Sequence, residues 1–310
     1  MGLIRRTLMM VTALLVSVPV VVAPVAAASA ALPAWACAPG AAANHGEAAA
    51  SELTPAGRGG QFREPDLGQA KRDMPASAKG RALADFAVTV DVYFHVVTNG
   101  TVGNLTGRQI NSQIAVLNTT FGGREGGAST GFSFELAGVT RTNNAKWFGS
   151  KAGAEHEMKK ALKQGDDSDL NVYSTTAGAY LGWAYLPPIT ESNQSYLDGI
   201  VLDWESLPGV SDAYEGAYDQ GETLTHEAGH WLNLEHTFQG GCREPNDFVD
   251  DTPAQATPTS GCPVGKDTCP APGVDPIHNY MDYSFDSCYT QFTQGQTQRM
   301  RDAWLLYRAS

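Results

Sequence analysis

Basic residues are scarce in this sequence of 310 residues. It has 21 lysines and arginines against 33 aspartates and glutamates, and its formal net charge is −12. Proteins that bind nucleic acid or anionic lipid usually present an excess of positive charge. The charge balance therefore argues against nucleic acid as a partner and suits a soluble secreted protein.

Long apolar runs are absent after the first 30 residues. Near its start the chain carries two arginines, then an apolar run at 8–25, and it reaches Ala28-Ser29-Ala30 soon after. A charged head, an apolar middle and an A-x-A tail are typical of a secretory signal peptide. A membrane anchor is the alternative, since the run is almost long enough to span a bilayer. Pro19 and Pro24 favour cleavage, and we expect residues 1–30 to be a signal peptide that leaves an extracellular product with no membrane segment.

Cysteine is also scarce, with five residues in the chain. In an oxidising compartment an even cluster of cysteines predicts disulfides, each worth about 3–4 kcal/mol for loops of this size. Four cysteines allow three pairings, and sequence spacing does not choose among them. A second zinc site is the alternative, but the sequence has no C-x-x-C pair. The clustered cysteines are Cys242, Cys262, Cys269 and Cys288, whereas Cys37 stands alone.

The run HEAGHWLNLEH at residues 226–236 contains three histidines and a glutamate next to the first of them. On a helix, residues four apart project from one face, about 6 Å apart along the axis. His226 and His230 can therefore bind one zinc ion, and Glu227 can reach a water molecule on that ion without ligating it. Surface histidines on an ordinary amphipathic helix are the alternative. The spacing favours zinc.

His236 can join this site only if the helix ends before it. Six positions after His230, a continuing helix would carry it about 120° away from the metal. Asn233 can provide the exit, because asparagine tolerates the left-handed backbone conformation that ends helices. Three histidines leave one tetrahedral position open for water, as in a catalytic zinc site. Glu227 can take a proton from this water and pass it to a leaving amine, so the expected reaction is peptide hydrolysis.

Strand and helix patterns alternate in the first half of the chain that follows the leader. Residues 31–81 are rich in alanine, glycine, proline and charge, and we expect them to be a propeptide. Residues 82–310 are predicted to form one catalytic domain of α/β (α+β) class with a twisted mixed sheet. Strands are predicted at 88–97, 131–142, 169–174, 182–186 and 199–204, and helices at 107–121, at 154–163 and from 221 or 222 through the zinc motif.

The alternation of strand and helix patterns ends at Phe238. The rest of the chain is rich in glycine, proline, aspartate and cysteine, with one further helix predicted at 293–307. A segment this irregular needs covalent support, which the clustered cysteines can supply. We therefore expect an upper subdomain with the sheet and a disulfide-held lower subdomain that ends in a helix. The active-site cleft would lie between them.

The zinc motif and a downstream turn that contains methionine together resemble the metzincin clan. The turn is Asn279-Tyr280-Met281-Asp282-Tyr283, and within the clan the chain resembles the pappalysin (cytophagalysin-like) family. The matching stretches are 226–238, 249–253, 279–284, 292–296 and Arg299-Met300, with Leu181-Gly182-Trp183-Ala184 upstream.

The resemblance implies roles for these residues. The three histidines would bind zinc, and Glu227 would be the general base and acid. Met281 would form a hydrophobic floor beneath the metal without ligating it. Tyr283 would help to stabilise the reaction intermediate, although a core aromatic residue in a tight turn is the alternative. Residues 182–185 would be an edge strand that pairs with an extended polypeptide substrate, and we expect the protein to be a monomer.

The resemblance also implies a disulfide pattern. It would pair Cys242 with Cys269 and Cys262 with Cys288. The chain departs from the metzincin pattern at Asn233, where the clan usually has glycine. Asparagine adopts the same conformation at modest cost, so we do not infer inactivity.

A calcium site is a further hypothesis. Asp247, Asp250, Asp251 and Thr252 place hard oxygen ligands in a loop rich in glycine and proline, as calcium sites require, and some family members bind calcium in this region. A solvated acidic turn with helix-capping residues is the alternative.

Cys37 is the basis of another hypothesis. A thiolate is a good zinc ligand, so a propeptide cysteine can occupy the open position and keep a zymogen inactive. An incidental thiol and a lipidation signal are the alternatives, and the second is disfavoured because Ala34 stands where leucine is wanted.

The sequence thus predicts a secreted zinc endopeptidase made as a preproenzyme. A zinc amidohydrolase or aminopeptidase that acts on small substrates is one alternative. A secreted binding protein on a degenerate protease fold is another, but such a protein has no need of Glu227 as a general base.

Overall fold

A five-stranded sheet organises the protein. The computed structural model describes residues 86–150, 153–178 and 180–309. The strand order is β2-β1-β3-β5-β4, and only β4, at one edge, runs antiparallel to its neighbour. The mixed sheet confirms the predicted fold class. The strands are β1 (Val88–Thr98), β2 (Phe132–Asn143), β3 (Leu170–Thr175), β4 (Gly182–Ala184) and β5 (Ile200–Asp203).

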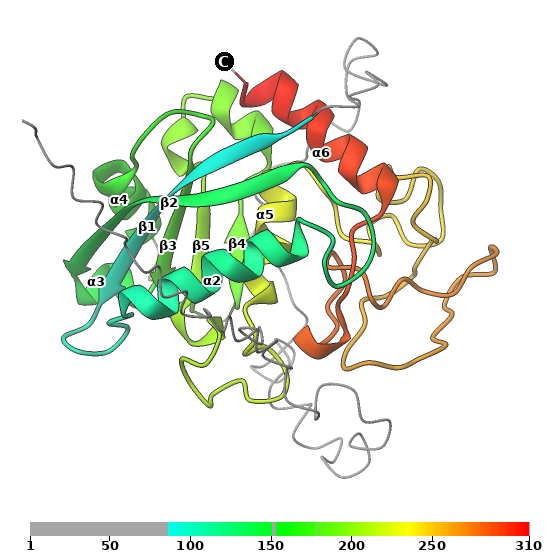
Figure 1. The fold of residues 1–310 in the computed structure, drawn as a ribbon, viewed down its shortest axis with the longest axis horizontal. Helices are drawn as coiled ribbons and strands as arrows, with labels where there is room; N and C mark the ends of the chain where they lie inside the picture. The colour runs from blue at the N-terminus through cyan, green and yellow to red at the C-terminus, as the bar shows by residue number, and fades with distance from the viewer. Residues whose placement is uncertain (1–85, 151–152, 179, 310) are drawn as a thin grey trace, which may run out of the picture. The chain divides into compact units, whose positions relative to one another are not determined.

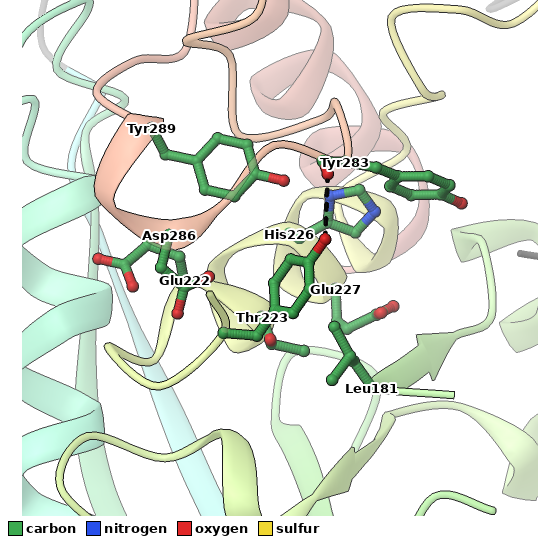
Figure 2. A pocket seen from close by; sticks show the side chains of 9 residues that line it. Leu181, Glu222, Thr223, His226, Glu227, Tyr283, Asp286 and Tyr289 are labelled. Carbon is green, nitrogen blue, oxygen red and sulfur yellow. Dashed lines mark hydrogen bonds between the residues drawn. The ribbon is translucent and has the colours of Figure 1, made fainter. Parts of the chain in front are cut away.

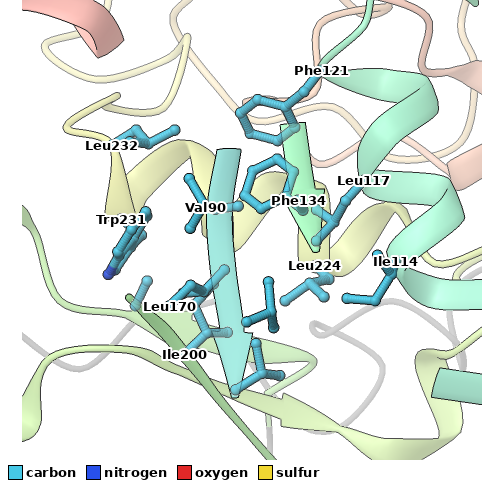
Figure 3. Packing of buried hydrophobic residues seen from close by; sticks show 14 of the residues in the cluster. Val90, Ile114, Leu117, Phe121, Phe134, Leu170, Ile200, Leu224, Trp231 and Leu232 are labelled. Carbon is cyan, nitrogen blue, oxygen red and sulfur yellow. The ribbon is translucent and has the colours of Figure 1, made fainter. Parts of the chain in front are cut away.

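Helices cover both faces of this sheet (Figure 1). On one face, α2 (Gly107–Thr120) and α5 (Glu222–Trp231) pack on apolar side chains of β1, β3 and β5 (Figure 3). On the other face, α3 (Ala145–Phe148) and α4 (Ala154–Leu162) cover a second apolar cluster. A largely parallel sheet needs this double cover, because both of its faces are apolar. The arrangement buries α5 completely and fixes it against the sheet.

The two longest helices begin at capping boxes. Thr106 precedes α2 and Thr293 precedes α6 (Gln294–Tyr307), and each threonine pairs with a glutamine three residues later. The threonine side chain accepts a hydrogen bond from the backbone N–H of the glutamine. The glutamine side chain accepts one from the backbone N–H of the threonine, so two otherwise unpaired donors are satisfied.

The lower part of the molecule has little regular structure between α5 and α6. Disulfides join Cys242 to Cys269 and Cys262 to Cys288, which is the pairing that the family resemblance implies. One short 3-10 turn, Asp286–Cys288, and backbone hydrogen bonds between loops complete this part. The disulfide-held half and its terminal helix agree with the predicted fold.

A few local features differ from the sequence predictions. β4 ends at Ala184, because Pro187 and Pro188 cannot continue a sheet ladder and instead begin a 3-10 turn. The one-turn helix α3 was not predicted. The predicted signal peptide, propeptide and Cys37 lie outside the described residues. Within the described ranges, no helix has both the length and the apolar character of a membrane span.

Candidate metal centre

The first two histidines of the motif lie on one face of α5. The Nε2 atoms of His226 and His230 are 3.1 Å apart, and both side chains are buried. A separation this short between two ring nitrogens is what one shared ion requires. Zinc with nitrogen ligands at about 2.0–2.1 Å places neighbouring ligands about 3.3 Å apart in a tetrahedron.

The third histidine reaches the site because the helix ends as the sequence predicted. Asn233 has a φ of 75°. The N–H of Leu234 donates to the carbonyl of Gly229 at 2.9 Å, and the N–H of Asn233 donates to that of His230 at 2.8 Å. These two bonds define a Schellman motif, which turns the chain out of the helix. His236 follows, and its Nε2 lies 3.1 Å from that of His230.

Backbone carbonyls orient two of the rings. The Nδ1 of His226 donates to the carbonyl of Tyr280 at 2.6 Å, and the Nδ1 of His230 donates to that of Leu234 at 2.7 Å. A carbonyl only accepts, so the proton of each neutral ring sits on Nδ1 and the lone pair on Nε2 points at the shared centre. In the described part of the chain, these histidines form one of two groups with metal-ligand geometry. The donor set fits zinc.

Met281 lies beneath the site and is fully buried. A side chain at Gly229 on α5 would collide with the Met281 sulfur. Gly229, two residues after Glu227, therefore lets the methionine turn approach the helix. This arrangement supports a floor role for Met281.

Tyr283 lies close to the third histidine. Its hydroxyl is 2.9 Å from Nε2 of His236, and its ring contacts those of His236 and Phe238 at centroid distances of 4.9 and 4.8 Å. The hydroxyl is thus presented to the centre where the three Nε2 atoms converge. The aromatic contacts hold the ring in this position.

Glu227 lies against the edge strand of the sheet. A Cβ at Gly182, the first residue of β4, would stand 3.0 Å from Cγ and 3.1 Å from Oε1 of Glu227. A larger side chain at this position would crowd the carboxylate. β4 therefore brings its free edge next to the glutamate and the histidines.

A pocket extends from His226 and Glu227 between the two halves of the molecule (Figure 2). Tyr218 donates a hydrogen bond across it to the carbonyl of Tyr283 at 3.3 Å. The pocket supports the predicted cleft, because its residues come from the β4 side, from α5 and the loop before it, and from the methionine turn and the loop after it. They are Leu181, Tyr218, Glu222, Thr223, His226, Glu227, Tyr283, Asp286 and Tyr289.

Two buried carboxyl groups lie side by side in this pocket, on Glu222 and Asp286 (Figure 2). Burial raises the pKa of both groups, and the charge of Asp286 raises the pKa of Glu222 further. The N–H of Gln220 donates to Asp286 at 2.9 Å, which favours the ionised form of that partner. Glu222 therefore keeps its proton near neutral pH, and Asp286 is the member of the pair that ionises first.

The acidic loop gathers only part of the predicted calcium set. The Thr252 hydroxyl lies 2.7 Å from both oxygens of Asp247 and 2.8 Å from the carbonyl of Val249. Asp250 is exposed. Asp251 accepts bonds from the N-terminus of α6 and so acts as a helix-capping residue.

Three charged residues anchor the end of α5. No pattern in the sequence singled them out as a group. Asp198 and Arg308 form a buried ion pair, and Arg308 and Arg299 both donate to backbone carbonyls at the helix exit. In the sequence these side chains are indistinguishable from surface charges. The residues in contact are about 65 to 110 positions apart in the sequence, so no local pattern predicts that they meet.

Comparison with known proteins identifies the family. Residues 210–304 match the model of the M43 peptidase family, described as Pregnancy-associated plasma protein-A. An extracellular metalloprotease of Neurospora crassa is 45% identical over 248 residues, which cover 78% of this chain and 83% of that protein. The chain belongs to the pappalysin family of metalloproteases. Extracellular metalloprotease 1 of Coccidioides posadasii is another relative, 42% identical over 81% of this chain and 90% of its own length.

Solved structures agree with the pappalysin assignment. Promirolysin of Tannerella forsythia superposes with a TM-score of 0.63 at 28% identity, covering 71% of this chain and 81% of that one. Mature mirolysin in complex with a cleaved peptide gives a TM-score of 0.61 at 30% identity, covering 69% of this chain and 90% of that one. The metzincin-type fold and the metallopeptidase activity expected from the sequence are both confirmed.

Proposed function

We propose that this pappalysin is a secreted zinc endopeptidase in which His226, His230 and His236 hold the metal and Glu227 moves the protons. The observation that carries the proposal is the convergence of three buried Nε2 atoms, with neighbouring pairs 3.1 Å apart. Zinc supplies a Lewis acid for the scissile carbonyl and lowers the pKa of the attacking water. Residues of the chain transfer the protons, stabilise the negative oxygen and bind the substrate.

Glu227 is the general base and acid of the reaction. Its carboxylate is held between α5 and Gly182, so it faces the position of a peptide that lies along β4. It takes a proton from the attacking water and delivers it to the departing amine nitrogen. The Tyr283 hydroxyl donates a hydrogen bond to the oxygen that becomes negative.

The substrate lies along β4 as an added strand. β4 pairs with β5 on one side only, because it ends the strand order of the sheet. Its outer backbone groups can therefore pair with an extended polypeptide by β-augmentation. The pocket beside Glu227 then receives one substrate side chain. The mirolysin complex with a cleaved peptide supports a polypeptide substrate.

Cleavage of casein by the purified mature protein tests this function. We expect internal cleavage that a chelator abolishes and zinc restores. Release of single terminal residues without internal fragments would favour an aminopeptidase. Absence of cleavage by a folded, zinc-loaded protein would favour the binding-protein alternative.

A Tyr283→Phe variant tests the role of the hydroxyl. The ring contacts are kept, and only the group 2.9 Å from His236 is lost. We expect kcat to fall by about 100-fold, as for loss of one oxyanion donor, with KM little changed. If Tyr283 is only a core aromatic residue, kcat of the variant will stay at the parental value.

Calcium binding at the acidic loop is a second proposal. Asp247, Thr252 and the Val249 carbonyl present their oxygens to one another, and burial raises the pKa of Asp247 to about 7. A raised folded-state pKa means that Asp247 contributes stability below its ordinary pKa of 3.8, and that this stability is lost as the pH rises towards 7. Calcium would compensate the buried carboxylate at the higher pH.

The calcium proposal predicts a pH-dependent melting temperature. After chelation and restoration of zinc, added calcium should raise the melting temperature at pH 8 and have little effect at pH 5, where the proton competes for Asp247. Asp250→Asn is the matched control and should respond as the parent does, because Asp250 is exposed. No effect of calcium at pH 8 would refute the site.

Export and latency are also proposals. Relatives in this family are named extracellular, which supports secretion and thus a signal peptide at residues 1–30. Residues 31–81 stay a predicted propeptide. Cys37 would then be placed to occupy the open zinc position in the precursor.

A further inference from the structure

The exit of the zinc helix is held by a buried arginine of the last helix. Arg299 lies on α6, and its Nε donates to the carbonyl of Asn233 at 2.7 Å. Only 8% of the residue is exposed, and its guanidinium stacks over Phe248 with its carbon 5.5 Å from the ring centre. A cation at this end of a helix is favoured, because the last carbonyls lack partners and carry partial negative charge.

This bond fixes one particular peptide plane. The Asn233 carbonyl and the Leu234 N–H belong to the same peptide unit. The N–H donates to Gly229 at 2.9 Å, while the carbonyl accepts from Arg299. The peptide is therefore anchored at both ends, in the left-handed turn where the clan usually has glycine.

The anchored peptide leads directly to the metal ligands. The next carbonyl, that of Leu234, accepts from Nδ1 of His230. His236 follows two residues later and brings its Nε2 to within 3.1 Å of that of His230. A rotation of the 233–234 peptide would move the acceptor of one ligand and the backbone of another.

We propose that Arg299 is a positioning residue of the zinc site, which sets the turn that orients His230 and delivers His236. The proposal rests on the zinc site proposed above. Partners that orient metal ligands in this way typically contribute 10–100-fold, as an order of magnitude, to metal affinity. Arg299 acts through the backbone and touches neither metal nor substrate.

A matched pair of variants isolates the hydrogen bond. In Arg299→Gln, the side-chain amide nitrogen stands the same number of bonds from the backbone as Nε, so a donor remains while the charge is lost. In Arg299→Met, a methyl group stands there, so the charge and the donor are both lost. The two side chains are similar in length, and both remove the buried cation.

The measurements are zinc affinity by chelator competition and the visible spectrum of the cobalt(II)-substituted protein. We expect Arg299→Met to lose about 10–100-fold in zinc affinity and to show an altered cobalt spectrum, whereas Arg299→Gln stays close to the parent. With an extended peptide, kcat of Arg299→Met should fall with KM unchanged, because β4 is not touched. A folded Arg299→Met protein with parental zinc affinity and spectrum overturns the proposal.

Two further outcomes are decisive. A parent protein that binds no zinc would contradict the proposed function itself, before any variant is compared. If Arg299→Met does not fold, Arg299→Lys decides, because lysine keeps the cation but places a methylene where Nε stood. We then expect weakened zinc binding, and an unchanged affinity and cobalt spectrum would overturn the role of Arg299.

Discussion

In a Glu227→Gln variant, we expect kcat/KM for an extended peptide to fall by about 10²–10⁴-fold, the usual contribution of a general base and acid. Glutamine has the size of glutamate, so the close contact with Gly182 and the burial are preserved. Its amide cannot take a proton from water. Zinc content and melting temperature should therefore stay near the parental values while turnover is lost, which steady-state kinetics with metal analysis can establish.

An exposed glutamate provides the control for this experiment. Glu215 lies outside the pocket on the loop before α5, and Glu215→Gln makes the same chemical change there. We expect its kinetics to match the parent. Parental cleavage by a zinc-loaded Glu227→Gln protein would refute the assigned mechanism.

The metal centre could be predicted from sequence because its three histidines lie within one helix and the turn that follows it. The positions of His226 and His230 follow from the helical repeat alone. The exit at Asn233 follows from the need to bring back His236, and the observed φ of 75° is the conformation that the prediction required. Interactions within about ten residues leave a readable pattern, since one helix and one turn determine them.

The alternation of strands and helices predicted the layers but not their order. The place of β4 at the edge, next to Glu227, depends on how the chain returns across β5. The family resemblance implied an edge strand that begins at Gly182, and the strand order agrees, but nothing in the sequence indicated the contact of Gly182 with Glu227. Its reason for being glycine, the approach of a carboxylate from α5, exists only in three dimensions.

Carboxylates show the limit of sequence reasoning most clearly. Asp247 and Asp251 are four residues apart in one acidic loop, and both were candidate calcium ligands. One is buried against Thr252, and the other caps α6. Residue type alone does not separate a metal ligand from a helix cap, because both roles need an acceptor oxygen.

The buried pair of Asp198 and Arg308 should be the most sensitive point for stability. The two side chains make a bidentate contact at 3.0 and 3.1 Å, and each is 1% exposed. Arg308 also donates to the carbonyl of Trp231 and lies 3.5 Å above its ring. Arg308, the residue that caps α6, and Asp198 therefore hold the end of α6 against Trp231, the last residue of the zinc helix.

Removal of one charge leaves the other buried without a partner. Burial alone would raise the pKa of Asp198, but the charge and hydrogen bonds of Arg308 outweigh it, and the net pKa is lowered. A lowered pKa means that the pair stabilises the fold above the ordinary value of 3.8 and loses this effect as the pH falls through the folded-state pKa. Measurements of stability at neutral pH therefore include the full contribution of the ion pair.

We expect Arg308→Met to lose about 3–5 kcal/mol of stability at pH 7, because breaking a buried pair costs far more than replacing it. For a domain of this size the melting temperature should fall by roughly 6–20 °C. The double variant Asp198→Leu with Arg308→Met removes both charges and should recover a large part of the loss. Calorimetry of the parent, both single variants and the double variant measures the coupling. Equal losses in the single and double variants would mean that Arg308 acts through its bonds to Trp231 and not through its charge pair.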